Sequence, residues 1–296
     1  MSEIAFCIDK GPRENLEDTC AAFKVTNALD HGQEAVVAMA LDGVGGANWG
    51  EVASSLARES LTADLTALAS LCISREGTRF NAPDKILGEL SNALAHSNEV
   101  ILQESASNPR LKGMATTAVC ALVLRGLLYV TWAGDSRCYL HRGYENRQIT
   151  RDHSEAEEMV QLGVITQEEA QEHPSSHTIT RYLGQAHGFQ PETRVCRIMP
   201  GDVVLLCSDG LTDVVTDEEI ATHIEACQAG LFDLDELPHM LVQRALGWGT
   251  QDNITVLCAG YEPTHTQAEH NRTLTEAYAV ELARTMQTLT QEVNHA

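Results

Sequence analysis

The chain has 296 residues and a formal net charge of −22, with 42 acidic against 20 basic side chains. Because so negative a surface repels phosphate backbones and anionic lipid headgroups, we expect no nucleic-acid binding and no membrane binding. A hydrophobic content of 43% with 21% charged residues is typical of a folded globular protein and not of a disordered one.

The N-terminal segment carries the acidic residues Glu3 and Asp9 and lacks the basic and apolar regions of a signal peptide. The longest apolar runs, residues 35–41 and 118–124, are too short to cross a bilayer. Nine cysteines occur without a C-x-x-C pair or zinc-ligand spacing, which favours free thiols in a reducing compartment and argues against structural zinc. We therefore expect a cytoplasmic protein.

Short segments dense in Val, Leu and aromatic residues, with Gly and Asp in the following turns, predict strands at residues 35–41, 118–124, 127–133, 194–198, 203–207 and 254–259. Apolar residues at helical spacing predict helices around residues 52–68, 86–101, 217–229 and 235–246. Residues 152–173 are acidic and helical in pattern, and we interpret them as an insertion over one edge of a sheet.

The chain after residue 262 has a different character. It is first polar and then carries apolar residues three or four apart, namely Leu274, Tyr278, Leu282, Met286, Leu289 and Val293. This spacing predicts an amphipathic helix of about six turns over part of residues 263–296. Since an isolated helix is marginal in water, its apolar face must be covered. It either folds back onto the body of the chain or pairs with a second copy or a partner protein.

The turn after the first predicted strand is rich in glycine, and it has two interpretations. One is a phosphate-binding loop, but no Gly-Lys-Ser/Thr follows, and Asp42 would repel an anion. The other makes Asp42 a metal ligand, with glycines such as Gly43 allowing the backbone and a second cation to approach closely.

Further acidic residues stand at the edges of predicted strands or close together near the N-terminus, namely Asp135, Asp209, Asp252, Glu17 and Asp18. Two carboxylates about 4 Å apart repel by about 4 kcal/mol at an effective dielectric constant near 20, so converging carboxylates require cations. Oxygen ligands without His or Cys at metal spacing favour Mg²⁺ or Mn²⁺. Two such ions that share a carboxylate can activate a bridging water and hold a phosphoryl group in line.

These segments, taken in order, resemble the metal-dependent protein phosphatase family (PPM, type 2C), particularly its compact bacterial members. The resemblance covers roughly residues 1–260 and rests on RENLED, DGVGGANWGEVAS, GMATTAV, AGDSRCYL, TRDHS, PGDVVLLCSDGLTD and QDNITV. It implies an α+β fold, an αββα sandwich of two antiparallel sheets flanked by helix pairs, to which residues 263–296 add a C-terminal helical extension. It also implies hydrolysis of phosphoserine and phosphothreonine in proteins, opposing a serine/threonine kinase, by water activated at a binuclear Mn²⁺ or Mg²⁺ centre.

The resemblance also assigns roles to individual residues of the metal centre. It implies that Asp42 bridges the two ions. Glu17 and Asp18 serve one side of the centre, where the carbonyl group of Gly43 completes the ligand set.

On the other side, the resemblance implies that Asp209 and Asp252 hold the second ion. Asp135 matches the ligand of a third, weaker metal site. Arg13 matches the phosphate-binding arginine, whose planar guanidinium suits bidentate contact. Residues 154–181 fall where bacterial members carry a mobile flap.

The sequence departs from the family pattern at two positions. Val44 stands where many eukaryotic relatives have His, a candidate general acid, so the proton donor to the leaving group is left open. Ala115 replaces the Gly of the GTT strand, a change that its small size makes tolerable. His153 of TRDHS is a candidate acid as well, but we interpret it as a residue that fixes the root of the flap.

Two other functions compete with this hypothesis. Cys7 and Arg13 fit the C-x5-R spacing of cysteine-dependent phosphatases, although Asp9 would place a negative charge in their phosphate cradle. A thiolate nucleophile requires an electropositive setting. The second rival is a catalytically silent phosphoprotein-binding module of the same fold, which the complete set of acidic residues disfavours.

Overall fold

The structure, a computed structural model, describes residues 3–27, 33–44, 49–74, 82–171 and 173–262. The predicted tail helix within residues 263–296 lies outside the described residues, so its packing stays a prediction. No helix in the described ranges is long and apolar enough to cross a membrane.

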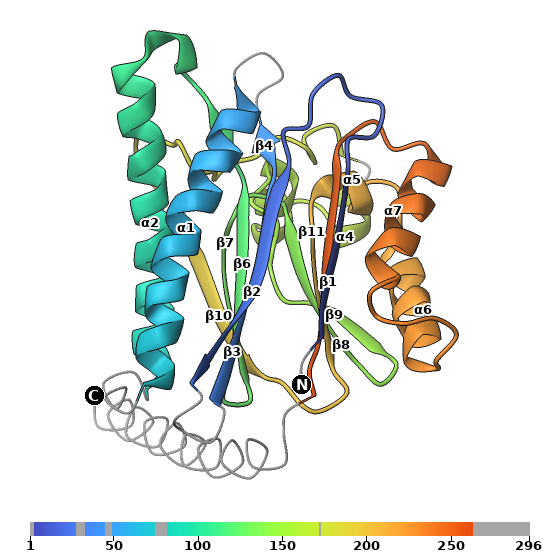
Figure 1. Cartoon of the computed structure of the whole chain (residues 1–296). Coiled ribbons are helices and arrows are strands. Elements are labelled where there is room, and N and C mark those ends of the chain that lie inside the picture. The colour runs from blue at the N-terminus through green and yellow to red at the C-terminus, as the bar shows by residue number, and fades with distance from the viewer. Residues whose placement is uncertain (1–2, 28–32, 45–48, 75–81, 172, 263–296) are drawn as a thin grey trace, which may run out of the picture.

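Two five-stranded antiparallel sheets form the centre of the described chain (Figure 1). One sheet has the order β1 (Glu3–Asp9), β12 (Ile254–Gly260), β11 (Val203–Cys207), β8 (Arg137–Arg142) and β9 (Glu145–Gln148). The other has the order β10 (Glu192–Arg197), β7 (Leu127–Ala133), β6 (Ala118–Leu124), β3 (Gln33–Leu41) and β2 (Thr19–Asn27). A short ladder joins β4 (Gly43–Val44) to β5 (Ala115–Thr116).

The central strands are apolar on both faces because both faces are covered. Along β6, the side chains of Cys120 and Leu122 belong to the core under the helices, while those of Val119 and Ala121 belong to the core between the sheets. This alternation follows the two-residue period of a strand. It explains why these segments read as continuous apolar runs.

Helices cover the outer faces of both sheets (Figure 1). The long helices α1 (Gly50–Ile73) and α2 (Pro83–Ser107) pack on the β2–β3–β6–β7–β10 sheet, and a 3-10 turn at Pro109–Leu111 follows α2. On the other sheet, α6 (Asp217–Gln228) and α7 (Leu237–Trp248) bury one apolar face each, next to the single turn α5 (Asp209–Thr212). The predicted αββα sandwich is therefore confirmed.

The apolar pattern missed several strands, because edge strands are only half-covered. β1, β2 and β9 are edge strands with at most one buried residue each, so they lack a continuous apolar run. β8 lies between β11 and β9, and its four buried residues include the polar His141. The acidic stretch between β9 and β10 contains two short helices, α3 (Glu155–Gln161) and α4 (Gln167–Gln171). It connects β9 of one sheet to β10 of the other.

Candidate metal and phosphate site

The predicted acidic residues meet at one end of the sandwich because antiparallel pairing brings the relevant strand ends together. Thr19 at the start of β2 pairs with Leu41 at the end of β3, which places Asp18 beside Asp42. Cys207 at the end of β11 pairs with Val256 of β12, which places Asp209 close to Asp252. The turn after β7 adds Asp135 at the same end.

Asp18 is held between the two sheets by hydroxyl groups. Its side chain is buried, and its Oδ2 accepts hydrogen bonds from Ser208 Oγ at 2.8 Å and Thr255 Oγ1 at 2.7 Å. Burial raises the pKa of Asp18 to about 7; the two hydroxyl groups oppose this shift, and the charges of Asp209 and Asp252 add to it. Its carboxyl group is therefore placed firmly, but its negative charge is poorly compensated.

Asp42 is fixed through its backbone, which leaves its side chain for other contacts. Its N–H donates to Thr117 Oγ1 at 3.1 Å, and its carbonyl oxygen accepts from the Thr117 N–H and from Thr116 Oγ1, both at 2.8 Å. Burial raises the pKa of the Asp42 carboxyl well above its usual range, and Asp18, Asp209 and Asp135 raise it further.

Asp135 shows the same behaviour on the other side of Asp209. It is buried, and its pKa lies well above the usual range because of burial first and then the charges of Asp209 and Asp152. Asp209 is therefore the charge that couples Asp18, Asp42 and Asp135. Its Oδ1 atom is buried and has no hydrogen-bond partner among the described residues.

Gly43 and Gly50 allow a close approach of two backbones beside Glu17. A Cβ atom at Gly43 would lie 2.5 Å from the carbonyl oxygen of Gly50, and one at Gly50 would lie 2.7 Å from the carbonyl oxygen of Gly43. The same Cβ at Gly50 would lie 3.1 Å from Cδ of Glu17. Only glycine fits at both positions. Their contact brings the Gly43 carbonyl group and the Glu17 carboxyl group into one neighbourhood.

Arg13 reaches the site from the loop between β1 and β2. Its Nη2 contacts Asp252 Oδ2 at 2.6 Å, and its Nε donates to the carbonyl oxygen of Gln251 at 2.8 Å. The pKa of Asp252 is nevertheless raised, because burial and the charge of Asp209 outweigh the guanidinium. The Arg13 side chain is 44% exposed, so it can turn toward a ligand in solvent.

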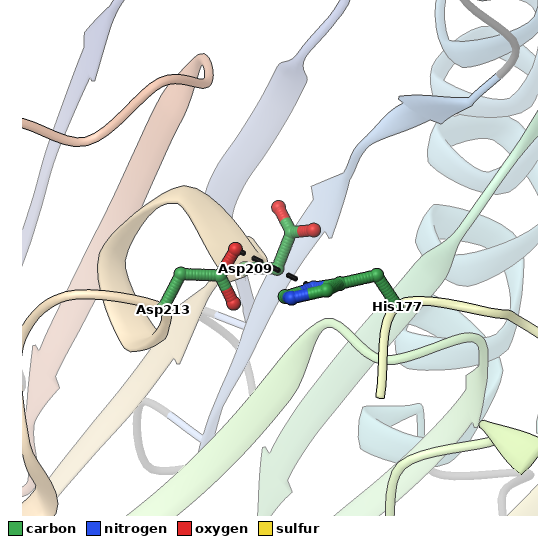
Figure 2. Close-up of side chains that lie close together, drawn as sticks. All are labelled: His177, Asp209 and Asp213. Atoms are coloured by element: carbon green, nitrogen blue, oxygen red, sulfur yellow. Dashed lines mark ion pairs between the residues drawn. The ribbon is translucent and has the colours of Figure 1, made fainter. Parts of the chain in front are cut away.

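Sequence reasoning missed Asp213 and His177, which approach Asp209 (Figure 2). One ligand atom from each of the three residues lies within 4.8 Å of the others, and His177 Nδ1 is 3.6 Å from Asp213 Oδ2. Burial, followed by the charge of Asp209, raises the pKa of Asp213 to about 7. The four-residue spacing of Asp209 and Asp213 in SDGLTD could have revealed Asp213. The position of His177 far along the chain gave no such signal.

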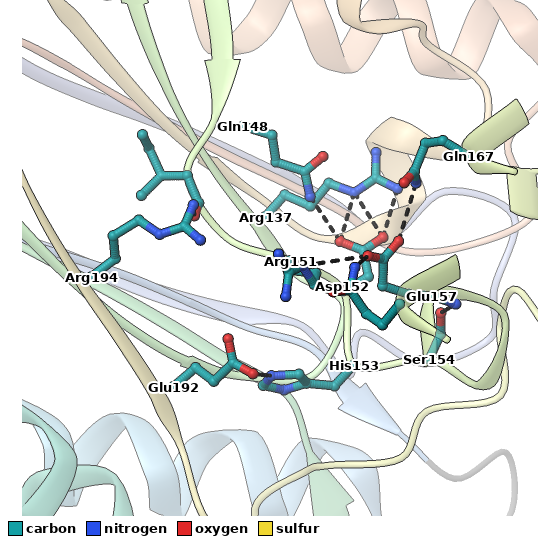
Figure 3. Close-up of polar contacts among 12 residues, drawn as sticks. Arg137, Gln148, Arg151, Asp152, His153, Ser154, Glu157, Gln167, Glu192 and Arg194 are labelled. Atoms are coloured by element: carbon teal, nitrogen blue, oxygen red, sulfur yellow. Dashed lines mark hydrogen bonds and ion pairs between the residues drawn. The ribbon is translucent and has the colours of Figure 1, made fainter. Parts of the chain in front are cut away.

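A groove of about 440 Å³ lies beside this cluster, between residues of the 154–181 segment and those of α5 and the start of α6. Its lining includes seven acidic residues, among them Asp135, Asp209, Asp213, Asp217 and Glu218. Arg137 also lines it, but its Nε and Nη2 atoms donate to the Asp152 carboxylate at 2.7–3.0 Å (Figure 3). The groove therefore remains negative.

His153 lies at the base of the 154–181 segment (Figure 3). The ring is buried, stacks on Trp132 with centroids 6.0 Å apart, and accepts the Gly134 N–H at Nδ1. Burial, then the charge of Arg181, lowers its pKa to about 4. The His153 carbonyl oxygen accepts the Thr180 N–H at 2.7 Å, which ties the two ends of the segment together.

The donor set fits hard divalent cations. This end of the sandwich offers carboxylate oxygens and one backbone carbonyl group, and the unpartnered, buried Oδ1 of Asp209 is an acceptor for which the described residues offer no donor. Such oxygen sets match Mg²⁺ and Mn²⁺. The raised pKa values of Asp18, Asp42 and Asp135 are those of carboxylates that lack a counter-charge.

Cys7 does not have the surroundings of a nucleophilic cysteine. It lies in β1 opposite Val256 and packs against the core under α6 and α7. Burial raises the pKa of its thiol, and the charge of Asp9 raises it further. A nucleophilic cysteine requires the opposite shift, so the geometry argues against a thiol mechanism.

We predict that removing divalent cations makes the stability of the protein fall as pH rises from about 4 to about 7. The folded chain retains protons on Asp18 and Asp213, whose pKa values are about 7, while the unfolded chain releases them near pH 4. With Mn²⁺ bound, ions replace those protons and the decline should disappear. Thermal unfolding with chelator and with Mn²⁺ should differ by at least about 5 °C more at pH 8 than at pH 5.

His153 acts in the opposite direction, because its lowered pKa removes stability as pH falls from about 6.5 toward 4. This contribution is common to both conditions and cancels in the difference. Parallel pH curves with and without Mn²⁺ would contradict the prediction.

The sequence of this chain is similar to those of known phosphatases. Residues 14–242 match the family described as Protein phosphatase 2C. The serine/threonine phosphatase stp of Listeria monocytogenes is 32% identical over 221 residues, which cover 75% of this chain and 82% of that protein. The serine/threonine protein phosphatase PstP of Mycobacterium tuberculosis is 38% identical over 218 residues, which cover 74% of this chain and 39% of PstP.

The fold is also similar to that of a solved phosphatase structure. The catalytic domain of PstP in complex with two manganese ions superposes with a TM-score of 0.68 at 32% identity, covering 88% of this chain and 97% of that one. The matched family region contains Glu17, Asp18, Asp42, Asp135 and Asp209 and ends before Asp252. The chain belongs to the protein phosphatase 2C family.

Proposed function

We propose that this protein removes phosphate from phosphoserine and phosphothreonine residues of other proteins at a binuclear Mn²⁺ or Mg²⁺ centre, and that it opposes a serine/threonine kinase. As a member of its family, the chain is a metal-dependent protein phosphatase. The observation that carries the proposal is the buried carboxylate cluster around Asp209, whose Oδ1 has no partner in the described chain.

Asp42 is suited to lie between the two ions, because its pKa responds both to Asp18 and to Asp209. We assign Glu17, Asp18 and the Gly43 carbonyl group to one ion. The close approach of Gly43 to Glu17 supports that grouping.

Asp209 and Asp252 are assigned to the second ion. Each of them raises the pKa of Asp18, and the charge of Asp209 also raises the pKa of Asp252. Asp135 is assigned to a third, weaker site. The approach of Asp213 and His177 to Asp209 adds two candidate ligands there. The third site opens on the acidic groove, and its candidate ligands Asp213 and His177 are partly exposed. We therefore expect it to bind a cation more weakly than the other two sites.

The bound cations supply a water of lowered pKa and offset the negative charge of the phosphoryl oxygens. Arg13 has two roles in the chain itself. Its guanidinium screens Asp252 at 2.6 Å, and its planar fork can turn to bind two phosphate oxygens of the substrate. Val44 offers no proton, and His153 is buried and held neutral, so neither donates to the leaving group.

We further assign the catalytic unit to residues 1–262, with residues 154–181 as a flap. The body already presents every proposed ligand, so we assign no ligand to residues 263–296, which either fold back onto the body or contact a second copy or a partner. The relatives are named serine/threonine phosphatases, which supports phosphorylated proteins as substrates.

The test is hydrolysis of a phosphothreonine peptide with Mn²⁺, with Mg²⁺ and with chelator. Activity should require a divalent cation and should survive Cys7→Ser unchanged. Arg13→Ala should raise KM more than it lowers kcat, because Arg13 grips the phosphate of the bound substrate.

Chelator-resistant activity that disappears in Cys7→Ser would replace this proposal with thiol chemistry. Tight Mn²⁺ binding without turnover of any phosphopeptide would instead indicate a silent binding module. An unchanged KM in Arg13→Ala would remove Arg13 from phosphate binding.

A further inference from the structure

Trp49 has an unfavourable backbone conformation at the edge of the acidic site. It precedes α1 with φ 64° and ψ 41°, in the left-handed region. A bulky residue is rarely found there, because the conformation is strained. Its side chain makes no capping hydrogen bond to the described residues, although Ser, Asn or Gly at this position would suit the helix better. The tryptophan is therefore not explained by local folding.

The backbone around Trp49 is nevertheless fixed to the site. Its carbonyl oxygen accepts the N–H groups of Val52 and Ala53, and the next residue, Gly50, packs against Gly43 and Glu17. A flexible loop end would not be constrained in this way.

Leu16 is brought to the same place from the loop between β1 and β2. Its neighbour Glu17 donates its N–H to Asn253 Oδ1 at 2.7 Å, and the Glu17 carbonyl oxygen accepts Ser54 Oγ of α1 at 2.6 Å. The β1–β2 loop and the start of α1 lie at one end of the sandwich (Figure 1). Leu16 and Trp49 thus each adjoin a residue of the Glu17–Gly50 contact.

Both side chains are exposed to solvent. Leu16 is 44% exposed and Trp49 is 43% exposed, in a chain whose net charge is −22. Exposed large apolar side chains next to a binding site are typical of contact residues for a partner, and tryptophan is enriched among those that dominate binding.

We propose that Leu16 and Trp49 form an apolar contact for the protein substrate, which favours an aliphatic or aromatic side chain close to the phosphorylated residue. This inference rests on the proposed function. The contact is continuous with the site through Glu17 and Gly50, so a substrate chain whose phosphate lies at the carboxylate cluster would pass over it. Leu16 and Trp49 determine substrate choice and take no part in the chemistry.

The experiment compares two phosphothreonine peptides that differ only in whether Leu or Ser flanks the phosphothreonine, together with a small aryl phosphate. Trp49→Gly removes the indole and suits the left-handed backbone, so the variant should fold. Trp49→Phe keeps an apolar ring. Trp248→Phe is the matched control, since Trp248 is 54% exposed on α7 and its ring contacts Arg244 and Glu219.

Wild-type protein should prefer the Leu peptide, and Trp49→Gly should lower kcat/KM for that peptide by about tenfold, the size expected for loss of an apolar contact. Turnover of the Ser peptide and of the aryl phosphate should stay within about twofold, and Trp49→Phe should restore most of the preference. Leu16→Ser should reduce the same preference, and Trp248→Phe should not.

An equal loss on all three substrates in Trp49→Gly would show a structural role and overturn the inference. A wild-type enzyme without preference between the peptides would overturn it too. Failure of the proposed function would look different, because wild-type protein would then hydrolyse neither the peptides nor the aryl phosphate with Mn²⁺.

Discussion

Replacing Asp209 with Asn should lower Mn²⁺-dependent kcat on a phosphothreonine peptide by at least about a thousandfold, with the fold intact. The charge of Asp209 raises the pKa values of Asp18, Asp42 and Asp135, so it stands at the centre of the proposed metal cluster. A neutral amide is a weaker ligand and removes that central charge. Asp209 Oδ1 has no hydrogen-bond partner among the described residues, so the substitution breaks no hydrogen bond at that atom.

The same variant should be more stable than wild type in chelator, because one repelling carboxylate is gone. Calorimetric titration should show weakened Mn²⁺ binding. The control is Asp235→Asn, an exposed acid before α7, which should leave rate and metal binding unchanged. If Asp209→Asn kept a tenth of the wild-type rate, the assignment of Asp209 as a ligand would be wrong.

Gly210→Ala should destabilise the protein by about 3 kcal/mol or more and abolish metal-dependent activity. A Cβ atom at Gly210 would lie 1.9 Å from the backbone oxygen of Asn253, so the backbone itself would have to move. Asn253 accepts the Glu17 N–H and donates from Nδ2 to the carbonyl oxygens of Lys10 and Asn15. Displacing Asn253 therefore disturbs the loop that places Glu17.

Gly88→Ala is the matched control for this substitution. Gly88 lies inside α2, and a Cβ atom there would have no described neighbour within 4 Å. It should stabilise the protein by about 0.5–1 kcal/mol through helix propensity. Urea unfolding measures both changes. A Gly210→Ala variant as stable as wild type would show that the backbone at Asn253 can move away from a Cβ atom without loss of stability.

The sequence by itself determined the central strands and the acidic residues at their ends. β6, β7 and β11 are buried on both faces, so they appear as uninterrupted apolar runs whose limits the pattern identified correctly. Asp42 directly follows one predicted strand and Asp209 follows another after a single residue, and the end of an apolar strand marks such a residue without knowledge of its neighbours. Local pattern was sufficient because each signal lies within a few residues.

Tertiary structure decided everything that depends on contact between distant segments. The edge strand β1 is recognisable only through its pairing with β12, some 250 positions along the chain. His177 comes to Asp209 from the 154–181 segment, and Arg13 comes to Asp252 from the N-terminal loop. The pKa shifts likewise belong to the cluster and to no single residue, because burial and mutual repulsion exist only after the chain has brought these charges together.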